Sequence, residues 1–125
     1  MTQHDDTLRL RHMLEHAQEA VRLADGRGRG DLDADRLLEL GLTRLLEIIG
    51  EAANLVSEET HEQYPHLPWR QMIGLRNRLI HGYDEVDLDI LWDIVQLDLP
   101  PLIAALERIV WGEQPRGRSV PDSDA

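Results

Sequence analysis

The sequence contains no cysteine, no phenylalanine and no lysine among its 125 residues. The absence of cysteine excludes a disulfide framework, a thiolate zinc site and a cysteine nucleophile. No long apolar run occurs, so we expect no membrane-spanning helix, and the first residues lack the positive charge and apolar stretch of a signal peptide. We therefore expect a soluble, cytoplasmic protein with one domain, because a second hydrophobic core would need a longer chain.

Basic residues are also scarce, with 13 arginines against 24 aspartates and glutamates and a formal net charge of −11. General nucleic-acid-binding proteins normally carry a basic face, so any contact with RNA or DNA has to be local. We attribute the absence of lysine mainly to genomic composition. It still means that every cationic side chain is a planar fork suited to phosphate.

Helix-forming residues dominate, and no stretch alternates apolar and polar residues over the length of a strand. We predict an all-α fold, an antiparallel bundle of four to five helices within residues 1–111, and a disordered tail over residues 112–125. The first expected helix covers Asp6–Ala24, and the second runs from a cap at Asp31 or Asp33 to Val56. A short helical turn is expected within Ser57–Gln63, followed by a third helix over Pro68–Ile80 with Gly82 as its left-handed terminator. The last helix is expected over Leu88–Trp111, where Pro100 and Pro101 kink or divide it.

The second expected helix has an unusually broad apolar arc. Its main apolar stripe consists of Leu38, Leu42, Leu45, Ile49, Ala52, Ala53 and Val56, and Leu37, Ile48 and Leu55 widen this stripe to one side. An arc of this width usually contacts more than one neighbour, and a second subunit is one candidate. On the first expected helix the apolar stripe consists of Leu10, Met13, Leu14, Ala17, Val21 and Ala24.

One segment departs from the acidic character of the chain. Residues 63–83 contain no acid in 21 positions. The same window holds five basic side chains, which are His66, Arg70, Arg76, Arg78 and His81. The sequence therefore predicts a local cationic surface on an acidic protein.

Arg76 occupies an unexpected position in this segment, near the middle of an apolar helical arc. An unpaired buried charge is costly, so Arg76 either pairs with an internal acid, for which Glu47 and Glu51 are candidates, or faces a seam that stays open to an anion. His81 has two interpretations. It is either a residue that caps the end of the helix, or a functional side chain on the same flank of the helix as Asn77. Gly74 lowers the stability of the helix by about 1 kcal/mol relative to alanine. The close approach of another helix or of a ligand would explain why a glycine is present there.

The run from Arg76 to Tyr83 reads Arg, four residues, His, one residue, Tyr. This pattern resembles the HEPN superfamily, and within it the HepT-like ribonuclease toxins. The segments Leu45–Asn54, Pro68–Gly74 and Asp87–Trp92 are similar to that family in the same order. The resemblance implies an all-helical homodimer with its motif helices facing across the two-fold axis, metal-independent RNA cleavage without a cofactor, and a partner antitoxin of the minimal nucleotidyltransferase type.

The resemblance also implies roles for individual residues. Arg76 and His81 would be catalytic, Asn77 would support them together with Arg70 and Arg78 as RNA contacts, and Tyr83 would accept AMP from the antitoxin, which silences the nuclease. The chemistry is physically reasonable, because attack by the RNA 2′-hydroxyl needs proton transfer, which histidine provides near neutral pH. It also needs a cation for the phosphorane charge, which arginine provides. A dimer supplies the second histidine that two proton transfers require.

Two other functions fit the same residues. A non-catalytic, nucleotide-binding partner of a nucleotidyltransferase would bind nucleotides without cutting RNA. A plain dimerisation scaffold would pair Arg76 internally, so that Arg76→Ala would destabilise the fold and change nothing else.

Two further motifs have simpler interpretations. His12 to His16 matches the His-x-x-Glu-His pattern of zinc proteases, but both histidines lie opposite the core stripe, so we interpret them as a solvated face and predict no metal site. The loop Gly26–Gly30 holds two arginines but lacks the lysine and hydroxyl ending of a nucleotide loop. We interpret it as a connection between helices.

Overall fold

The computed structural model describes residues 3–83 and 85–112. Over these residues the chain is helical and contains no strand, only an isolated bridge, so the all-α prediction is confirmed. The elements in chain order are α1 (Gln3–Ala24), α2 (Asp31–Ala34), α3 (Arg36–Leu55), α4 (Glu58–Gln63), α5 (Trp69–Ile73), α6 (Leu75–Leu79), α7 (Leu88–Asp93), the π-helical segment η1 (Ile94–Asp98) and α8 (Leu99–Gly112). The predicted tail, apart from Gly112, lies outside the described residues.

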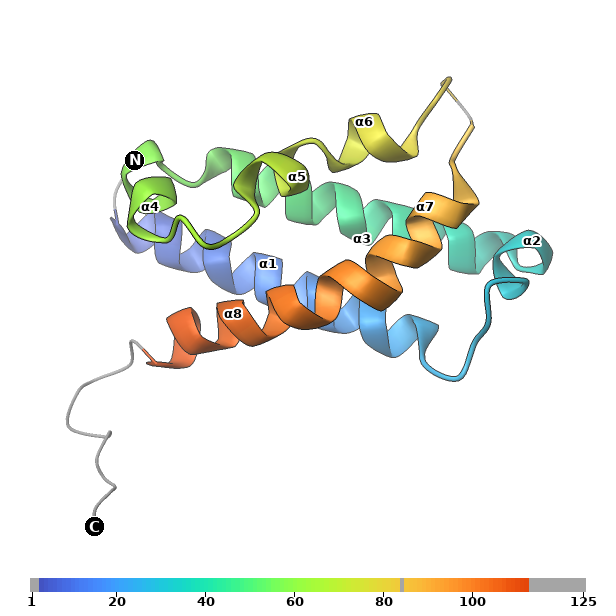
Figure 1. The fold of residues 1–125 in the computed structure, drawn as a ribbon, viewed down its shortest axis with the longest axis horizontal. Coiled ribbons are helices and arrows are strands. Elements are labelled where there is room, and N and C mark those ends of the chain that lie inside the picture. Colours follow the sequence, from blue (N-terminus) through green and yellow to red (C-terminus); the bar gives the residue numbers. More distant parts are fainter. Residues whose placement is uncertain (1–2, 84, 113–125) are drawn as a thin grey trace, which may run out of the picture.

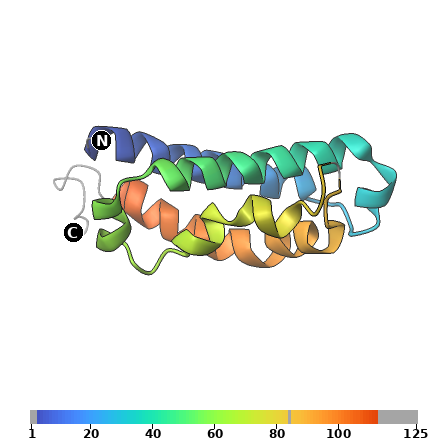
Figure 2. The same ribbon diagram turned by 90° about the horizontal axis from the view of Figure 1, so that it is seen from above.

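The helices form an antiparallel bundle. Helix α1 runs along α3 in the opposite direction, α5 and α6 together run back along α3, and α7, η1 and α8 form the last rod, which packs on α1 (Figures 1 and 2). None of the described helices combines the length and the apolar character needed to cross a membrane.

The core follows the predicted helical stripes closely. On α1 the buried apolar residues are Leu10, Met13, Leu14, Ala17, Ala20 and Ala24. Ala20 was not expected in this set, whereas Val21, which was, is only partly buried. All the residues of the main stripe predicted on α3, from Leu38 to Val56, are buried. The apolar period of 3.6 residues therefore identified the faces that these two helices bury.

The predicted cap of the second long helix is wrong by a few residues. Asp35 caps α3, because its side chain accepts a hydrogen bond from Leu38 N at 3.1 Å. Asp31 instead accepts from Gly28 N at 2.7 Å, and Asp33 lies inside the short helix α2. The extra turn of α2 was hidden in the sequence, because several aspartates in this stretch are equally suited to capping.

The third long helix that the sequence predicts is divided in the structure. Gly74 separates α5 from α6, with backbone angles of φ −86° and ψ 7°. The close approach expected at Gly74 occurs instead at Gly50 of α3, where an added Cβ would lie 2.7 Å from the carbonyl oxygen of Met72. Gly50 thus lets α5 cross α3 nearly backbone to backbone.

The irregularity expected at the proline pair is present. Segment η1 interrupts the last rod immediately before Pro100 and Pro101. A proline ring collides with the carbonyl of the residue four positions earlier, and these carbonyls belong to Gln96 and Leu97. The wider π turn accommodates the two rings without ending the rod.

Candidate functional site

A clamped loop between α6 and α7 carries the motif histidine and tyrosine. Ile80 leaves the helix in an extended conformation, with φ −110° and ψ 117°, and pairs in antiparallel fashion with Val86. His81 N donates to Glu85 O and Asp87 N donates to Leu79 O, each at 2.8 Å. These bonds hold the two ends of the loop together.

The structure corrects three expectations about this region. Helix α6 ends at Leu79, so His81 neither caps the helix nor shares a helical flank with Asn77. Gly82 does not have a positive φ, and among the described glycines only Gly26 does, at 77°. The β-branched side chains of Ile80 and Val86 favour the extended pairing, which a search for helical periodicity does not detect.

Tyr83 lies toward the turn of this loop and is fully exposed. No other large apolar or aromatic side chain in the described residues is as accessible. Its hydroxyl is therefore open to a large partner, such as the active site of another protein.

Arg76 reaches from α6 to α3, where its Nη1 lies 2.7 Å from Oε2 of Glu47. Glu47 was one of the two predicted partners, but the pair is not internal, because 67% of the arginine side chain is exposed. The predicted apolar arc is split. Leu75 and Leu79 face the core, whereas Ile73 and Arg76 face outward.

The same carboxylate takes part in a small charge network along α3. Arg44 Nη1 lies 3.5 Å from Glu47 Oε1 and 3.5 Å from Glu51 Oε2. Glu51, the other predicted partner of Arg76, thus pairs with Arg44. Glu47 stands between two guanidinium groups that come from different helices.

His81 also faces a carboxylate, since its Nε2 lies 3.2 Å from Oδ2 of Asp87. The other oxygen of Asp87, Oδ1, accepts a hydrogen bond from Ile90 N at 3.0 Å and so caps α7. The hydrogen bond from Ile90 N, followed by that from His81, lowers the pKa of Asp87 despite the opposing effect of desolvation. The carboxylate is consequently charged at neutral pH.

The other predicted RNA contacts are more scattered. Arg70 and Asn77 are exposed. Arg78 points toward the last rod, where its Nη1 lies 3.7 Å from Oδ2 of Asp98. It is one of the residues that line a mainly apolar cavity of about 340 Å³ between α5–α6 and η1–α8. Arg76 and Arg78 therefore lie on different sides of α6.

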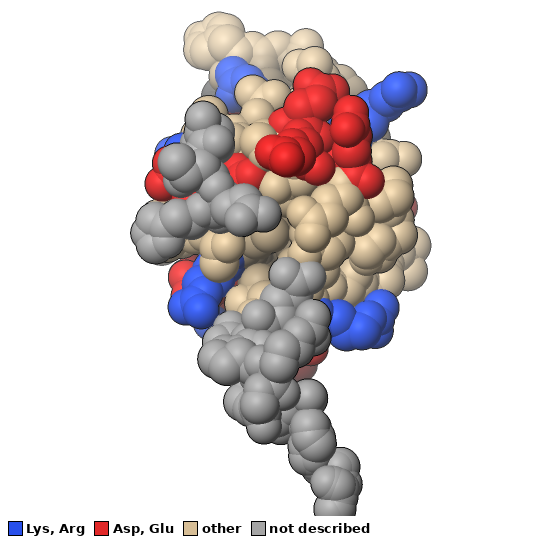
Figure 3. Space-filling model, turned by 90° about the vertical axis from the view of Figure 1, so that its left-hand side faces the viewer, with Lys and Arg blue, Asp and Glu red and all other residues tan. Residues whose placement is uncertain are grey.

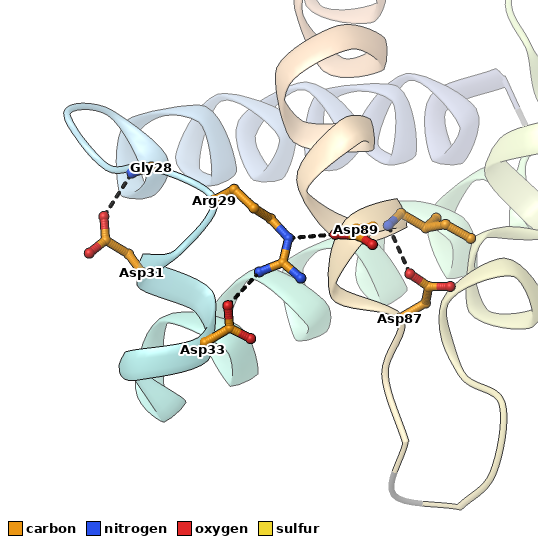
Figure 4. Close-up of polar contacts among 7 residues, drawn as sticks. Gly28, Arg29, Asp31, Asp33, Asp87 and Asp89 are labelled. Atoms are coloured by element: carbon orange, nitrogen blue, oxygen red, sulfur yellow. Dashed lines mark hydrogen bonds and ion pairs between the residues drawn. The ribbon is translucent and has the colours of Figure 1, made fainter.

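The arginine-glycine loop is a connection between elements, as interpreted from the sequence. Arg27 pairs with Asp35 at 3.3 Å, and Arg29 bridges Asp33 at 3.0 Å and Asp89 at 2.7 Å (Figure 4). The hydrogen bond with Asp89 is the main cause that raises the pKa of Arg29. The loop thereby ties α2 to the first turn of α7, close to the cap residue Asp87 (Figure 4).

The histidine pair on α1 gives no sign of a metal site. His16 Nδ1 lies 2.6 Å from the carbonyl oxygen of His12, one turn away. Within residues 3–83 and 85–112, no three histidine, aspartate or glutamate side chains are grouped so that they could hold a metal ion.

Acidic side chains are exposed at both ends of the bundle. Acidic side chains gather at the end of the bundle that carries α4 (Figure 3), where Glu58, Glu59 and Glu62 are exposed. The loop between α6 and α7 lies at the opposite end (Figure 1). Glu85 and Asp89 are exposed at this end too, so the motif side chains have carboxylates beside them.

Sequence reasoning missed Asp87 as a neighbour of the motif histidine. The available signal was an aspartate three residues before an apolar residue at the start of a helix, which is typical of an N-cap. This signal indicates that a helix begins after Asp87, but it does not indicate that the second carboxylate oxygen of Asp87 faces His81.

Comparisons with known proteins give a consistent result. The family model described as "Ribonuclease HepT-like" matches residues 13–109. A protein of Methanocaldococcus jannaschii provisionally named as an RNase is 33% identical over 107 residues, which cover 86% of this chain and 98% of that protein. A protein of Thermococcus cleftensis provisionally named as ribonuclease HepT is 35% identical over 100 residues, which cover 77% of this chain and 91% of that protein. No solved structure matches at a comparable level.

Proposed function

The chain belongs to the ribonuclease HepT-like family and is a ribonuclease, and we propose that it cuts RNA without a metal ion at a site that two copies build together. The observation that carries this proposal is the exposure of both motif side chains. Arg76 and His81 lie at the surface, and each is held by a carboxylate from another element. A scaffold role would need Arg76 in a buried pair.

In the proposed reaction the 2′-hydroxyl of RNA attacks the adjacent phosphorus, and the 5′-oxygen of the next nucleotide leaves. His81 accepts or donates a proton, and its counterpart in the second copy performs the opposite transfer. The guanidinium of Arg76 binds the phosphate oxygens as negative charge develops on them. Asn77, Arg70 and Arg78 are proposed to contact RNA around this centre, with Arg78 farther along the strand because it lies on the other side of α6.

An exposed apolar face on α3 supports the homodimer. Leu37 and Leu55 are 79% and 51% exposed, and their separation of 18 residues is five helical turns, so they lie in one row. Four further apolar side chains on α1, α3 and α5 are exposed, namely Leu8, Leu23, Leu40 and Ile73. A second copy that covered this row would bring the two Arg76 side chains toward each other, because Arg76 contacts α3 at its edge.

The exposed Tyr83 supports the proposal that the ribonuclease is the toxin of a toxin–antitoxin pair. A minimal nucleotidyltransferase antitoxin would transfer AMP from ATP to the tyrosine oxygen with release of pyrophosphate. The new phosphate would add negative charge and bulk beside His81, where the RNA phosphate would otherwise bind.

The test is incubation of the purified protein with RNA in the presence of a chelator. We expect wild type to cut RNA, and we expect Arg76→Ala and His81→Ala to remain folded and lose cleavage. His66→Ala is the matched control, because His66 lies in the same acid-free segment and is exposed. Cleavage at the normal rate by either folded motif variant would refute the proposal.

Light scattering tests the assembly separately. Leu37→Glu together with Leu55→Glu should convert a dimer into single chains and remove cleavage, because each chain alone lacks the second histidine. A dimer that persists in this variant would exclude the α3 row as the interface.

A further inference from the structure

The carboxylate of Asp87 has both of its oxygen atoms engaged in different ways. Oδ1 accepts from the backbone of Ile90 at 3.0 Å, and Oδ2 faces Nε2 of His81 at 3.2 Å. The first contact fixes the orientation of the carboxylate, because an N-cap side chain has a defined position relative to its helix. The second contact transmits this orientation to the imidazole ring.

The position of Asp87 is itself held from two directions. Its backbone N donates to Leu79 O, which joins the start of α7 to the end of α6. Two residues further on, Asp89 accepts from Nε of Arg29 at 2.7 Å, which anchors the first turn of α7 to the loop after α1 (Figure 4). The carboxylate opposite His81 therefore belongs to a braced part of the fold, although it lies near an exposed loop.

This contact determines which nitrogen of the imidazole carries a proton. A carboxylate can only accept hydrogen bonds, so Nε2 of His81 must be the donor and bears hydrogen. Nδ1 is then the nitrogen that remains for exchange of a proton with RNA.

We propose that Asp87 is the positioning residue of His81, which holds the ring in one tautomer and presents Nδ1 to the substrate. This inference rests on the proposed function, since it assigns a role in RNA cleavage to a residue that does not touch RNA. Replacing a group that orients a metal-binding histidine from behind typically changes activity by about 10- to 100-fold, and an aspartate-to-asparagine change that leaves a catalytic histidine in the wrong tautomer can lower kcat by about 10⁴-fold.

Asp87→Asn is a sharp test because asparagine caps helices about as well as aspartate. To cap α7, the amide oxygen must accept from Ile90 N, so the amide NH₂ faces Nε2 of His81. This NH₂ is a donor, and it favours the tautomer with hydrogen on Nδ1. Asp35→Asn is the matched control, because Asp35 also caps a helix with one oxygen and pairs through the other with a cation, Arg27.

The full-length protein is measured without RNA by nitrogen NMR of its histidines, at a pH where the rings are neutral, and the His81 signals are assigned from their loss in His81→Ala. We expect hydrogen on Nε2 in wild type and Asp35→Asn, and on Nδ1 in Asp87→Asn. In cleavage assays we expect Asp87→Asn to lower kcat by at least about 10-fold with KM nearly unchanged, and Asp35→Asn to cut RNA at the wild-type rate.

An unchanged tautomer in Asp87→Asn would overturn the proposal, and so would a changed tautomer with an unchanged kcat. If wild type cuts no RNA, the proposed function fails, and the tautomer alone then decides whether Asp87 positions His81. The two failures are thus distinguishable.

Discussion

The guanidinium of Arg76 lies 2.7 Å from the carboxylate of Glu47, and the acid is the more deeply buried partner, with 16% of its side chain exposed against 67% for the arginine. The acid on α3 thus holds the arginine of α6 at the surface. A phosphate that approaches Arg76 has to share the guanidinium with this carboxylate. Glu47 is therefore expected to weaken RNA binding while it keeps the guanidinium in place.

Removal of the Glu47 charge should strengthen RNA binding. We expect Glu47→Gln, made in the non-cleaving His81→Ala background, to bind RNA several-fold more tightly at low salt, because Arg76 is no longer neutralised by a neighbouring anion. The dissociation constant can be measured by fluorescence anisotropy with labelled RNA over a series of salt concentrations.

Glu51→Gln is the control for this measurement. It removes the same charge one turn further along α3, but Glu51 pairs with Arg44 instead of Arg76. A general effect of net charge would strengthen binding equally in both variants. A specific effect on Arg76 requires a clearly larger change for Glu47→Gln.

The exposure of Tyr83 leads to a prediction about modification. Transfer of AMP to the wild-type protein should add one or more AMP units to Tyr83 and abolish RNA cleavage, whereas Tyr83→Phe should stay unmodified and active, because it lacks the acceptor oxygen. Intact-mass spectrometry after incubation with the partner nucleotidyltransferase and ATP measures the addition. Tyr64→Phe, which alters the other tyrosine of the chain, should be modified and silenced like wild type.

The long helices could be predicted from the sequence because each of them buries one continuous stripe. The apolar stripes on α1 and α3 identify the face that each helix buries. Pro100 and Pro101 indicate an irregularity in the last helix, because a proline disturbs a helix regardless of how that helix packs. The capping residue of α3 was harder to identify, because Asp31, Asp33 and Asp35 have the same chemistry and only the course of the loop distinguishes them.

The candidate site was predictable as a set of residues but not as a geometry. The pattern from Arg76 to Tyr83 is contiguous in the sequence, and so it could be found there. The carboxylates that hold its side chains come from α3 and from the start of α7, and Glu47 was identified only as one of two equal candidates. The break at Gly74 and the extended Ile80 arise from pairing with distant segments, which helical periodicity does not encode.

A buried carboxylate near the start of α1 predicts loss of stability in acid. Desolvation raises the pKa of Asp6, but hydrogen bonds from Ser57 and Thr60 outweigh it and lower the pKa below the ordinary value of 3.8. Asp6 accepts from Ser57 N at 3.0 Å, from Ser57 Oγ at 2.5 Å and from Thr60 Oγ1 at 2.6 Å. These bonds join α1 to the cap of α4.

We expect Asp6→Asn to lower the free energy of unfolding at neutral pH by about 1–3 kcal/mol, because one buried acceptor is lost. A pKa lowered by folding contributes stability that is full above the unfolded value and is lost as the pH falls through the folded value. The difference between wild type and Asp6→Asn should therefore stay constant down to a pH of about 4 and shrink below it. Urea unfolding over this range measures it, and the exposed Asp25→Asn should show no difference at any pH.

The crossing at Gly50 links the stability of the fold to the geometry of the site. An alanine Cβ at this position would meet the carbonyl oxygen of Met72 at 2.7 Å, so α5 must move away from α3. We expect Gly50→Ala to lower the free energy of unfolding by about 1–3 kcal/mol, although alanine favours a helix by about 1 kcal/mol relative to glycine. Gly30→Ala is the control, since Gly30 has helical backbone angles and open space around it. It should be neutral or slightly stabilising.

Because α5 continues through Gly74 into α6, the same displacement should pull Arg76 away from Glu47, so folded Gly50→Ala protein should also cut RNA more slowly. Wild-type stability in Gly50→Ala would mean that the two backbones do not cross as closely as the structure has them.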